Sequence, residues 1–163
     1  MKKFNQIAEF GKSLMSIDDM ENVLELIADE AKQLVDAERC SIFIVDEEDK
    51  ILWTKLSDGI GRIVLSLDSG IVGATYHSKE PQVVNKPYED ERFLASIDKK
   101  SGYKTKNMIT VPIFNSKRNV MGILQLLNKK QFDFDDEDLD LLTFFANYVS
   151  GNLEFVILSE KKL

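Results

Sequence analysis

Apolar and polar residues alternate along the chain with two different periods. Near both ends the apolar residues recur every three or four positions, which is typical of helices that bury one face. The first such pattern covers residues 4–15, and the second follows Asp18 or Asp19, either of which suits a helix N-cap. A third begins near Asp133 and reaches Ile157, with carboxylates in its first turn, where they suit the helix dipole.

The middle of the chain carries short runs of β-branched and apolar residues separated by polar turns. These runs predict strands at 40–45, 51–56, 63–67, 108–114 and 120–127, with a brief edge strand at 82–85 after Pro81. Short helices are expected over 71–77 and within 90–97. Because neighbouring strands form hairpins and helices lie at both ends, we expect an α+β fold around an antiparallel sheet.

Composition limits the class of protein and its partners. The 163 residues, 44% of them hydrophobic, fit a single domain over 1–163. A net charge of −7 repels phosphate backbones, so neither nucleic acid nor an anionic membrane is expected as a partner. Cys40 is the only cysteine, which rules out an intrachain disulfide. With no signal-like N-terminus and no evident membrane span, we expect a cytoplasmic protein.

The residues give little support to an enzyme. His77 has no partner that the sequence reveals, and Cys40, within a predicted strand, suits a buried position better than a redox role. The acidic residues from 133 to 138 lack the ligand pattern of a calcium loop and fit a capped helix start. We therefore expect no catalytic residues, no metal and no cofactor.

Two segments offer polar groups for a ligand. Gly70 to Gly73 opens a predicted helix, whose first N–H groups are available to an anion. Residues 98–107 combine a carboxylate, hydroxyls, four lysines and a glycine. These groups either orient a polar ligand in an apolar pocket or form a basic surface loop.

Several of these segments together resemble a GAF domain. They are GIVG at 70–73, DERF at 90–93, SGYKTKN at 101–107, VPI at 111–113 and GILQLLNK at 122–129. The resemblance runs from about residue 18 to 155 and is closest to the cyclic-nucleotide-binding GAF domains of phosphodiesterases and bacterial adenylyl cyclases. The hallmark of that group is Asn-Lys, a spacer, Phe, three residues, then Asp-Glu. It matches Asn128, Lys129, Phe132, Asp136 and Glu137.

The resemblance implies a fold and a set of binding residues. The sheet would have about six strands, with the terminal helices on one face and short helices and a ligand pocket on the other. Backbone N–H groups at Val72 and Gly73 would hold a cyclic phosphate, and Lys129 would pair with Asp136. Ser57 replaces a frequent aromatic ring, and Gln125 stands where a carboxylate sometimes reaches the ligand. The remaining implied contacts are Ser41 and Asp58 to the base, and Asp98, Ser101 and Thr105 to the nucleotide.

These features favour a regulatory, ligand-sensing module of a signal-transduction protein that binds cAMP or cGMP. The alternative is a GAF module that binds another small metabolite or acts only as a dimerisation scaffold. Enzymes of this fold, such as methionine sulfoxide reductases, depend on catalytic cysteines, which Cys40 alone does not provide. An output domain would be linked covalently outside this chain.

The last predicted helix has a second apolar set besides the one that would pack on the sheet. Its members are Leu141, Phe144, Tyr148 and Phe155. Either the first helix or a partner chain must cover this set. We expect a homodimer formed through the terminal helices.

Overall fold

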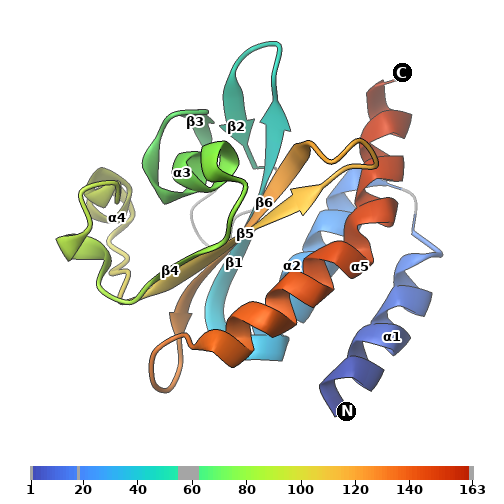
Figure 1. Ribbon diagram of the computed structural model, residues 1–163, viewed down its shortest axis with the longest axis horizontal. Coiled ribbons are helices and arrows are strands. Elements are labelled where there is room, and N and C mark those ends of the chain that lie inside the picture. Colours follow the sequence, from blue (N-terminus) through green and yellow to red (C-terminus); the bar gives the residue numbers. More distant parts are fainter. Residues whose placement is uncertain (1, 18, 55–62, 162–163) are drawn as a thin grey trace.

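A six-stranded sheet organises the chain. The computed structural model describes residues 2–17, 19–54 and 63–161. The strands follow the order β3-β2-β1-β6-β5-β4, and every neighbouring pair is antiparallel (Figure 1). Their bounds are β1 Ala37–Asp46, β2 Ile51–Trp53, β3 Val64–Ser66, β4 Gln82–Val84, β5 Met108–Phe114 and β6 Val120–Lys129. The predicted antiparallel α+β sheet is confirmed.

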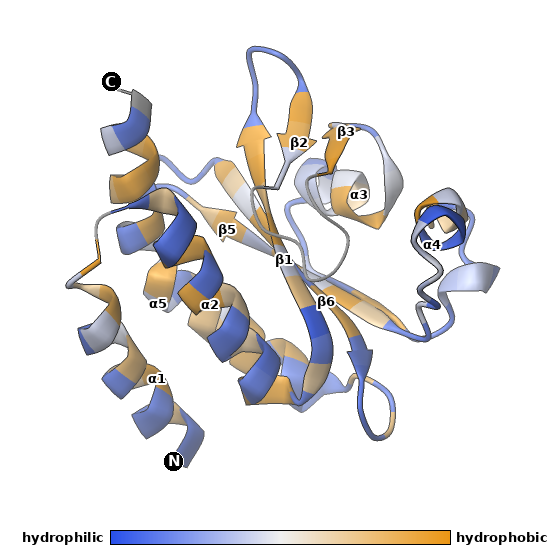
Figure 2. Cartoon of the chain, turned by 180° about the vertical axis from the view of Figure 1, so that it is seen from behind, coloured by the Kyte–Doolittle hydropathy of each residue, from blue (hydrophilic) through white to orange (hydrophobic). Residues whose placement is uncertain are grey.

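Three helices cover one face of the sheet. Helices α2 (Met20–Val35) and α5 (Asp136–Lys161) pack on the strands, and α1 (Lys2–Leu14) lies outside them (Figure 2). Asp19 caps α2, because its carboxylate accepts a hydrogen bond from the Asn22 N–H. The predicted stripe of α5 fills the core between helices and sheet. It comprises Leu142, Phe145, Ala146, Val149, Leu153 and Val156, which are buried, and the partly buried Ile157.

The opposite face carries the short elements. Helix α3 (Gly70–Ser78), the 3-10 turn η1 (Pro87–Glu89) and helix α4 (Ala95–Ser101) lie there. Alternate residues of each central strand point to the two faces. Ile42 and Ile44 of β1 therefore join the core under α2 and α5, whereas Phe43 joins a second apolar cluster with Val72 of α3.

Helix α4 lies later in the chain than the expected helical turns at 90–97. The Asp90 carboxylate accepts hydrogen bonds from the backbone N–H and the guanidinium of Arg92. These bonds hold residues 90–92 in a turn, a conformation that competes with a helix. The helix therefore starts at Ala95, and the expected helical position was wrong by several residues.

Helix α5 begins at Asp136 rather than near Asp133. Asp135 and Asp138 form a reciprocal capping box: the Asp138 N–H donates to the Asp135 carboxylate at 2.9 Å, and the Asp135 N–H donates to Asp138 at 3.0 Å. Backbone hydrogen bonding from Asp138 keeps the pKa of Asp135 below its usual value. The cap fixes where the helix can start, and it leaves Asp133 outside.

By length and composition alone, α5 from Asp136 to Glu160 is apolar enough to cross a membrane, although the sequence pattern predicted no membrane span. A single helix of this kind is weak support for a membrane span, because a core helix passes the same test. Phe145, Val149 and Leu153 of α5 are fully buried against α2 and the sheet. Packing in the domain thus accounts for the buried stripe of α5, whereas Phe155 and Leu158 on the same helix stay exposed.

Candidate functional site

A small cavity lies between the sheet and the short helices. Its lining comes from β1, β5 and β6 below, and from β3, α3 and the segment around α4 above. The cavity measures about 50 Å³, room for little more than water. The lining is mainly apolar, with Gln125, Asp98 and Thr105 as its polar side chains. Its apolar members are Phe43, Ile63, Leu65, Ile71, Val72, Phe93, Leu94, Ile97, Met108 and Leu127.

The floor of the cavity carries a row of polar residues across three strands. Ser41 of β1 is paired in register with Gln125 of β6, and Gln125 with Thr110 of β5. The Thr110 hydroxyl is hydrogen-bonded to the Thr75 hydroxyl of α3 at 2.6 Å. Of the row, only Gln125 lines the cavity. A neutral amide thus faces a mainly apolar cavity, where it can both donate and accept.

The start of α3 forms one wall of the cavity. Ser69 is the N-cap, but its side chain makes no capping hydrogen bond, so the N–H groups of Gly70, Ile71 and Val72 lack a side-chain cap. The Gly73 N–H donates to the Ser69 carbonyl at 2.9 Å within the helix. A Cβ at Gly73 would lie 2.7 Å from the Leu67 carbonyl oxygen. Gly73 therefore allows α3 to pack closely on the preceding turn, and Val72 reaches the cavity.

The cavity is covered by a lid, which we define as residues 89–105 and which includes α4. Asp98 of α4 is buried and connects α4 to Thr105 at the end of the lid and to Tyr88 just before its start. Its carboxylate accepts hydrogen bonds from the Thr105 N–H at 2.7 Å, the Thr105 hydroxyl at 2.9 Å and the Tyr88 hydroxyl at 2.5 Å. The bond to Asp98 raises the pKa of Tyr88. Asp98 and Thr105 both line the cavity, but they are bonded to each other.

Two residues implied by the resemblance lie elsewhere. Ser101 is exposed at the end of α4, where its hydroxyl donates to the Asp98 carbonyl and accepts from the Tyr103 N–H. It does not line the cavity. Asp58, like Ser57, falls outside the residues that the structure describes. The structure thus brings Val72, Asp98, Thr105 and Gln125 together, with Ser41 beside Gln125 in the sheet.

A contact that the sequence pattern did not predict attaches the end of the lid to β1. The Tyr103 hydroxyl donates to Glu38 of β1 at 2.8 Å, and the Arg39 guanidinium stacks over the Tyr103 ring at 3.7 Å. The hydrogen bond from Tyr103 lowers the pKa of Glu38, and burial raises the pKa of Tyr103. Glu38 and Tyr103 are far apart in sequence, so no local pattern points to this pair.

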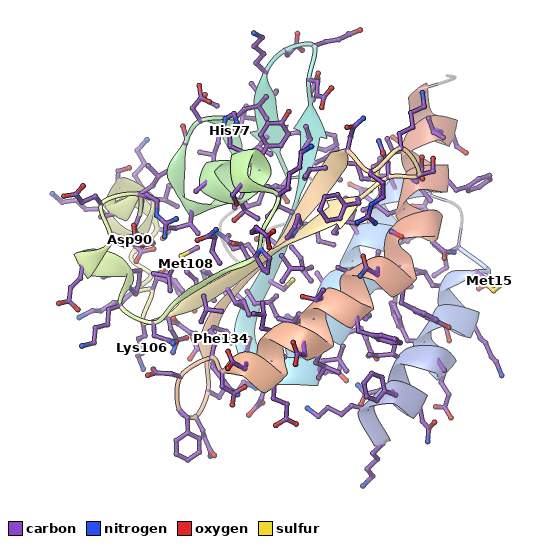
Figure 3. All side chains as sticks on the ribbon, viewed as in Figure 1. Met15, His77, Asp90, Lys106, Met108 and Phe134 are labelled. Carbon is purple, nitrogen blue, oxygen red and sulfur yellow. The ribbon has the colours of Figure 1, made fainter. Side chains whose placement is uncertain are left out.

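Asn128 joins the end of the lid to the sheet. Its side-chain oxygen accepts hydrogen bonds from the N–H groups of Lys106 at 2.6 Å and Asn107 at 3.3 Å. Its amide nitrogen donates to the Lys104 carbonyl at 2.9 Å and to Glu38 at 3.3 Å. Asn128 is buried and has a left-handed backbone, with φ of 60°. Lys106 and Met108, on either side of Asn107, are labelled in Figure 3.

The other hallmark residues lie between the end of β6, at Lys129, and the first turn of α5. The Lys129 ammonium is 2.5 Å from the Asp138 carboxylate and 4.0 Å from that of Asp135. The expected pairing of Lys129 with Asp136 is therefore wrong. Asp138 turns inward because it belongs to the capping box, whereas Asp136 and Glu137 are exposed. Phe132 is also exposed, at 88%, in the preceding turn.

The two residues considered for catalysis lie apart from the cavity lining. His77 is exposed on α3, and its Nε2 lies 2.6 Å from the Asp68 carboxylate (Figure 3). Cys40 is buried in the core on the helix side of the sheet, as expected. Among the described residues, no group of three or more metal-ligating side chains is positioned to hold an ion.

Comparison with known proteins identifies relatives of the chain. The chain is 30% identical over 175 residues to a protein of Caenorhabditis elegans named "Probable 3',5'-cyclic phosphodiesterase pde-5", covering 98% of the chain and 24% of the relative. It is 32% identical over 172 residues to the "Dual 3',5'-cyclic-AMP and -GMP phosphodiesterase 11A" of Takifugu rubripes, covering 90% of the chain and 19% of the relative. The chain thus spans about a quarter or less of these proteins.

A solved structure and a family match agree with the fold. The GAF domain of an Acinetobacter phosphoenolpyruvate-protein phosphotransferase superposes with a TM-score of 0.83 at 20% identity, covering 99% of this chain and 98% of the other. At that identity the likeness concerns the fold alone. The GAF domain family matches residues 19–153. The chain therefore belongs to the GAF domain family.

Proposed function

We propose that this chain is the ligand-sensing module of a signalling protein and that its ligand is a cyclic nucleotide. The carrying observation is one cavity that combines an apolar lining with a helix N-terminus, a carboxylate and a free amide. Two relatives with phosphodiesterase names, both about 30% identical, support the choice of ligand class.

Each part of a cyclic nucleotide has a suitable counterpart in the cavity. The first N–H groups of α3 suit the phosphate, because a helix N-terminus carries partial positive charge and unpaired donors. The apolar side chains suit the faces of the base, and Gln125 suits its polar edge. Asp98 carries negative charge, so the phosphate would lie toward α3 and away from the lid.

Binding requires the lid to move. Ligand sites usually measure about 300–1,000 Å³, whereas this cavity measures about 50 Å³. Hydrogen bonds to residues outside the lid hold it over the cavity: the Tyr88 hydroxyl donates to Asp98, and the Asn128 amide donates to the Lys104 carbonyl. A ligand would therefore stabilise a state in which α4 is displaced outward, and the change in lid position is the signal.

The first experiment is a thermal-shift titration with cAMP, cGMP and AMP. A ligand at 100 times its Kd adds about 2.7 kcal/mol of stability, which raises Tm by a few degrees in a domain of this size. The protein is first unfolded and refolded to remove any nucleotide retained from expression. A shift with a cyclic nucleotide and none with AMP supports the proposal. No shift with either cyclic nucleotide contradicts it.

We further propose that the module works as a homodimer through α1 and α5 and that it performs no catalysis itself. Phe4 of α1 packs edge-on against Phe144 of α5, so α1 covers part of the second apolar set. Phe155 and Leu158 remain 63% and 52% exposed. A Phe155→Asp variant should lower the mass in solution, whereas Phe132→Asp, at another exposed phenylalanine, should not. An unchanged dimer in the first variant would exclude this face.

A further inference from the structure

Gln125 differs from the other polar side chains of the cavity because its hydrogen-bonding groups are uncommitted. Across the described part of the chain, its amide makes no hydrogen bond to any other group, although it lines the cavity. It projects from the middle of β6, between Ser41 and Thr110 in register. A rigid central strand therefore presents one donor and one acceptor to whatever enters.

The remaining polar side chains in the lining are already used. The Asp98 carboxylate accepts three hydrogen bonds, two of them from Thr105, and the Thr105 hydroxyl donates to Asp98. Below them, Thr110 is bonded to Thr75. Moving the lid does not detach Asp98 from Thr105 by itself, because both belong to the lid and move together. Among the polar side chains of the described lining, Gln125 is therefore the one whose donor and acceptor are both available to the polar edge of a base.

This limit separates the two purines. The polar edge of adenine pairs one N–H donor with one ring-nitrogen acceptor, which is the complement of a single amide. Guanine presents a carbonyl, a ring N–H and an exocyclic amino group, so one amide that pairs with the first two leaves the amino group without a partner. Burying an unpaired donor costs about 1–3 kcal/mol, equivalent to about a 5- to 150-fold loss of affinity. The C2–H of adenine, in the place of that amino group, is apolar and matches the aliphatic lining.

We propose that Gln125 makes this cavity selective for an adenine nucleotide over the corresponding guanine nucleotide. The inference rests on the proposed function, because it names the base that the same site accepts. It assigns the role to the neutral amide specifically: a carboxylate at this position would accept two donors from guanine but offer none to the ring nitrogen of adenine.

The test compares Kd values for cAMP and cGMP, measured by calorimetry on the whole chain and on variants. The wild type should bind cAMP at least about fivefold more tightly than cGMP. Gln125→Glu should lower that preference by about tenfold or more, or reverse it. Gln131→Glu, in an exposed turn, introduces the same charge and should leave the preference unchanged. Gln125→Met keeps the length of the side chain but has no amide. It should weaken cAMP binding and bring the ratio of the two Kd values closer to one.

The outcomes separate this inference from the proposed function. Equal affinities in the wild type, or tighter binding of cGMP, would overturn the selectivity and leave the cyclic-nucleotide sensor intact. The same holds if Gln125→Glu and Gln125→Met both keep the wild-type preference. Binding of neither nucleotide would overturn the proposed function, and this inference with it. If Gln125→Glu melts below the assay temperature, Gln125→Met decides.

Discussion

Replacing Asn128 tests the most connected side chain around the lid. In Asn128→Ala, the Lys104 carbonyl and the Lys106 N–H lose their hydrogen-bond partner. Each lost bond costs about 1 kcal/mol, and more where the group that remains is buried. An alanine also fits the left-handed backbone at this position poorly, which adds about 1–2 kcal/mol. The free energy of unfolding should therefore fall by about 3–4 kcal/mol.

A glycine at the same position separates the two causes. Asn128→Gly loses the same hydrogen bonds, but glycine adopts a positive φ without steric cost. We therefore expect Asn128→Gly to be more stable than Asn128→Ala by about 1 kcal/mol, although glycine in an ordinary strand is the less stable residue. Asn128→Asp keeps the acceptor, loses both donated bonds and places a second carboxylate beside Glu38, so it should also be destabilised.

Urea denaturation followed by circular dichroism gives the three free energies. Asn119→Ala serves as the control, because Asn119 lies in an exposed turn and its side chain has no hydrogen bond among the described residues. It should change stability by less than about 0.5 kcal/mol. A loss below about 1 kcal/mol in Asn128→Ala would refute the importance of these hydrogen bonds. An alanine variant as stable as the glycine variant would refute the argument from the backbone.

Three further predictions concern packing and charge. Lys129→Met should lower the free energy of unfolding by about 1–3 kcal/mol, because it leaves the buried Asp138 carboxylate without its cation. Its control, Asp136→Asn, should lower that free energy by less than about 0.5 kcal/mol. Equal losses in the two variants on urea denaturation would show that Asp136 is the partner of Lys129. Gly73→Ala should lose about 1–3 kcal/mol, because its Cβ would meet backbone atoms at 2.7 and 2.8 Å. Gly151→Ala, with open space around its Cβ, should gain up to about 1 kcal/mol, so thermal unfolding showing the same sign for both would contradict the structure. The lowered pKa of Glu38 implies a contribution to stability that is present above about pH 4 and is lost as the pH falls through that lowered pKa. Because Tyr103→Phe removes the hydrogen bond to Glu38, this variant should lose less stability between pH 6 and pH 3 than the wild type. An equal loss in the two proteins would exclude the Glu38–Tyr103 bond as the cause.

Hydrophobic periodicity was sufficient to predict the sheet and the core helices. Burial repeats along a strand or helix with a fixed period, and the residues from Leu142 to Ile157 follow it through most of α5. The GAF resemblance was likewise confirmed by the family match. These features depend on many residues at once, so single exceptions do not change the result.

The predictions were wrong where the structure depends on a single side-chain contact. The carboxylates of Asp135, Asp136 and Asp138 are equivalent in the sequence, and only the capping geometry turns Asp138 toward Lys129. The position of α4 depended on the hydrogen bonds between Asp90 and Arg92, which no periodicity reveals. The contact of Tyr103 with Glu38 joins residues that only the folded sheet brings together.

The candidate binding residues were predicted in part. Val72, Asp98, Thr105 and Gln125 do line one cavity. The sequence could not show that Asp98 and Thr105 are hydrogen-bonded to each other, whereas the Gln125 amide has no hydrogen-bond partner among the described residues. Whether these residues contact a ligand stays a prediction.

The hydrogen bonds of the Asn128 side chain have a consequence for how such a domain can change its ligand during evolution. Three of its four hydrogen bonds go to main-chain atoms, at Lys104, Lys106 and Asn107. Main-chain atoms are present whatever side chains the lid carries. Mutations that reshape the cavity can therefore accumulate in the lid without releasing its attachment to the sheet. One scaffold can in this way acquire new ligand preferences while it keeps the same hydrogen-bonded connection between the lid and β6.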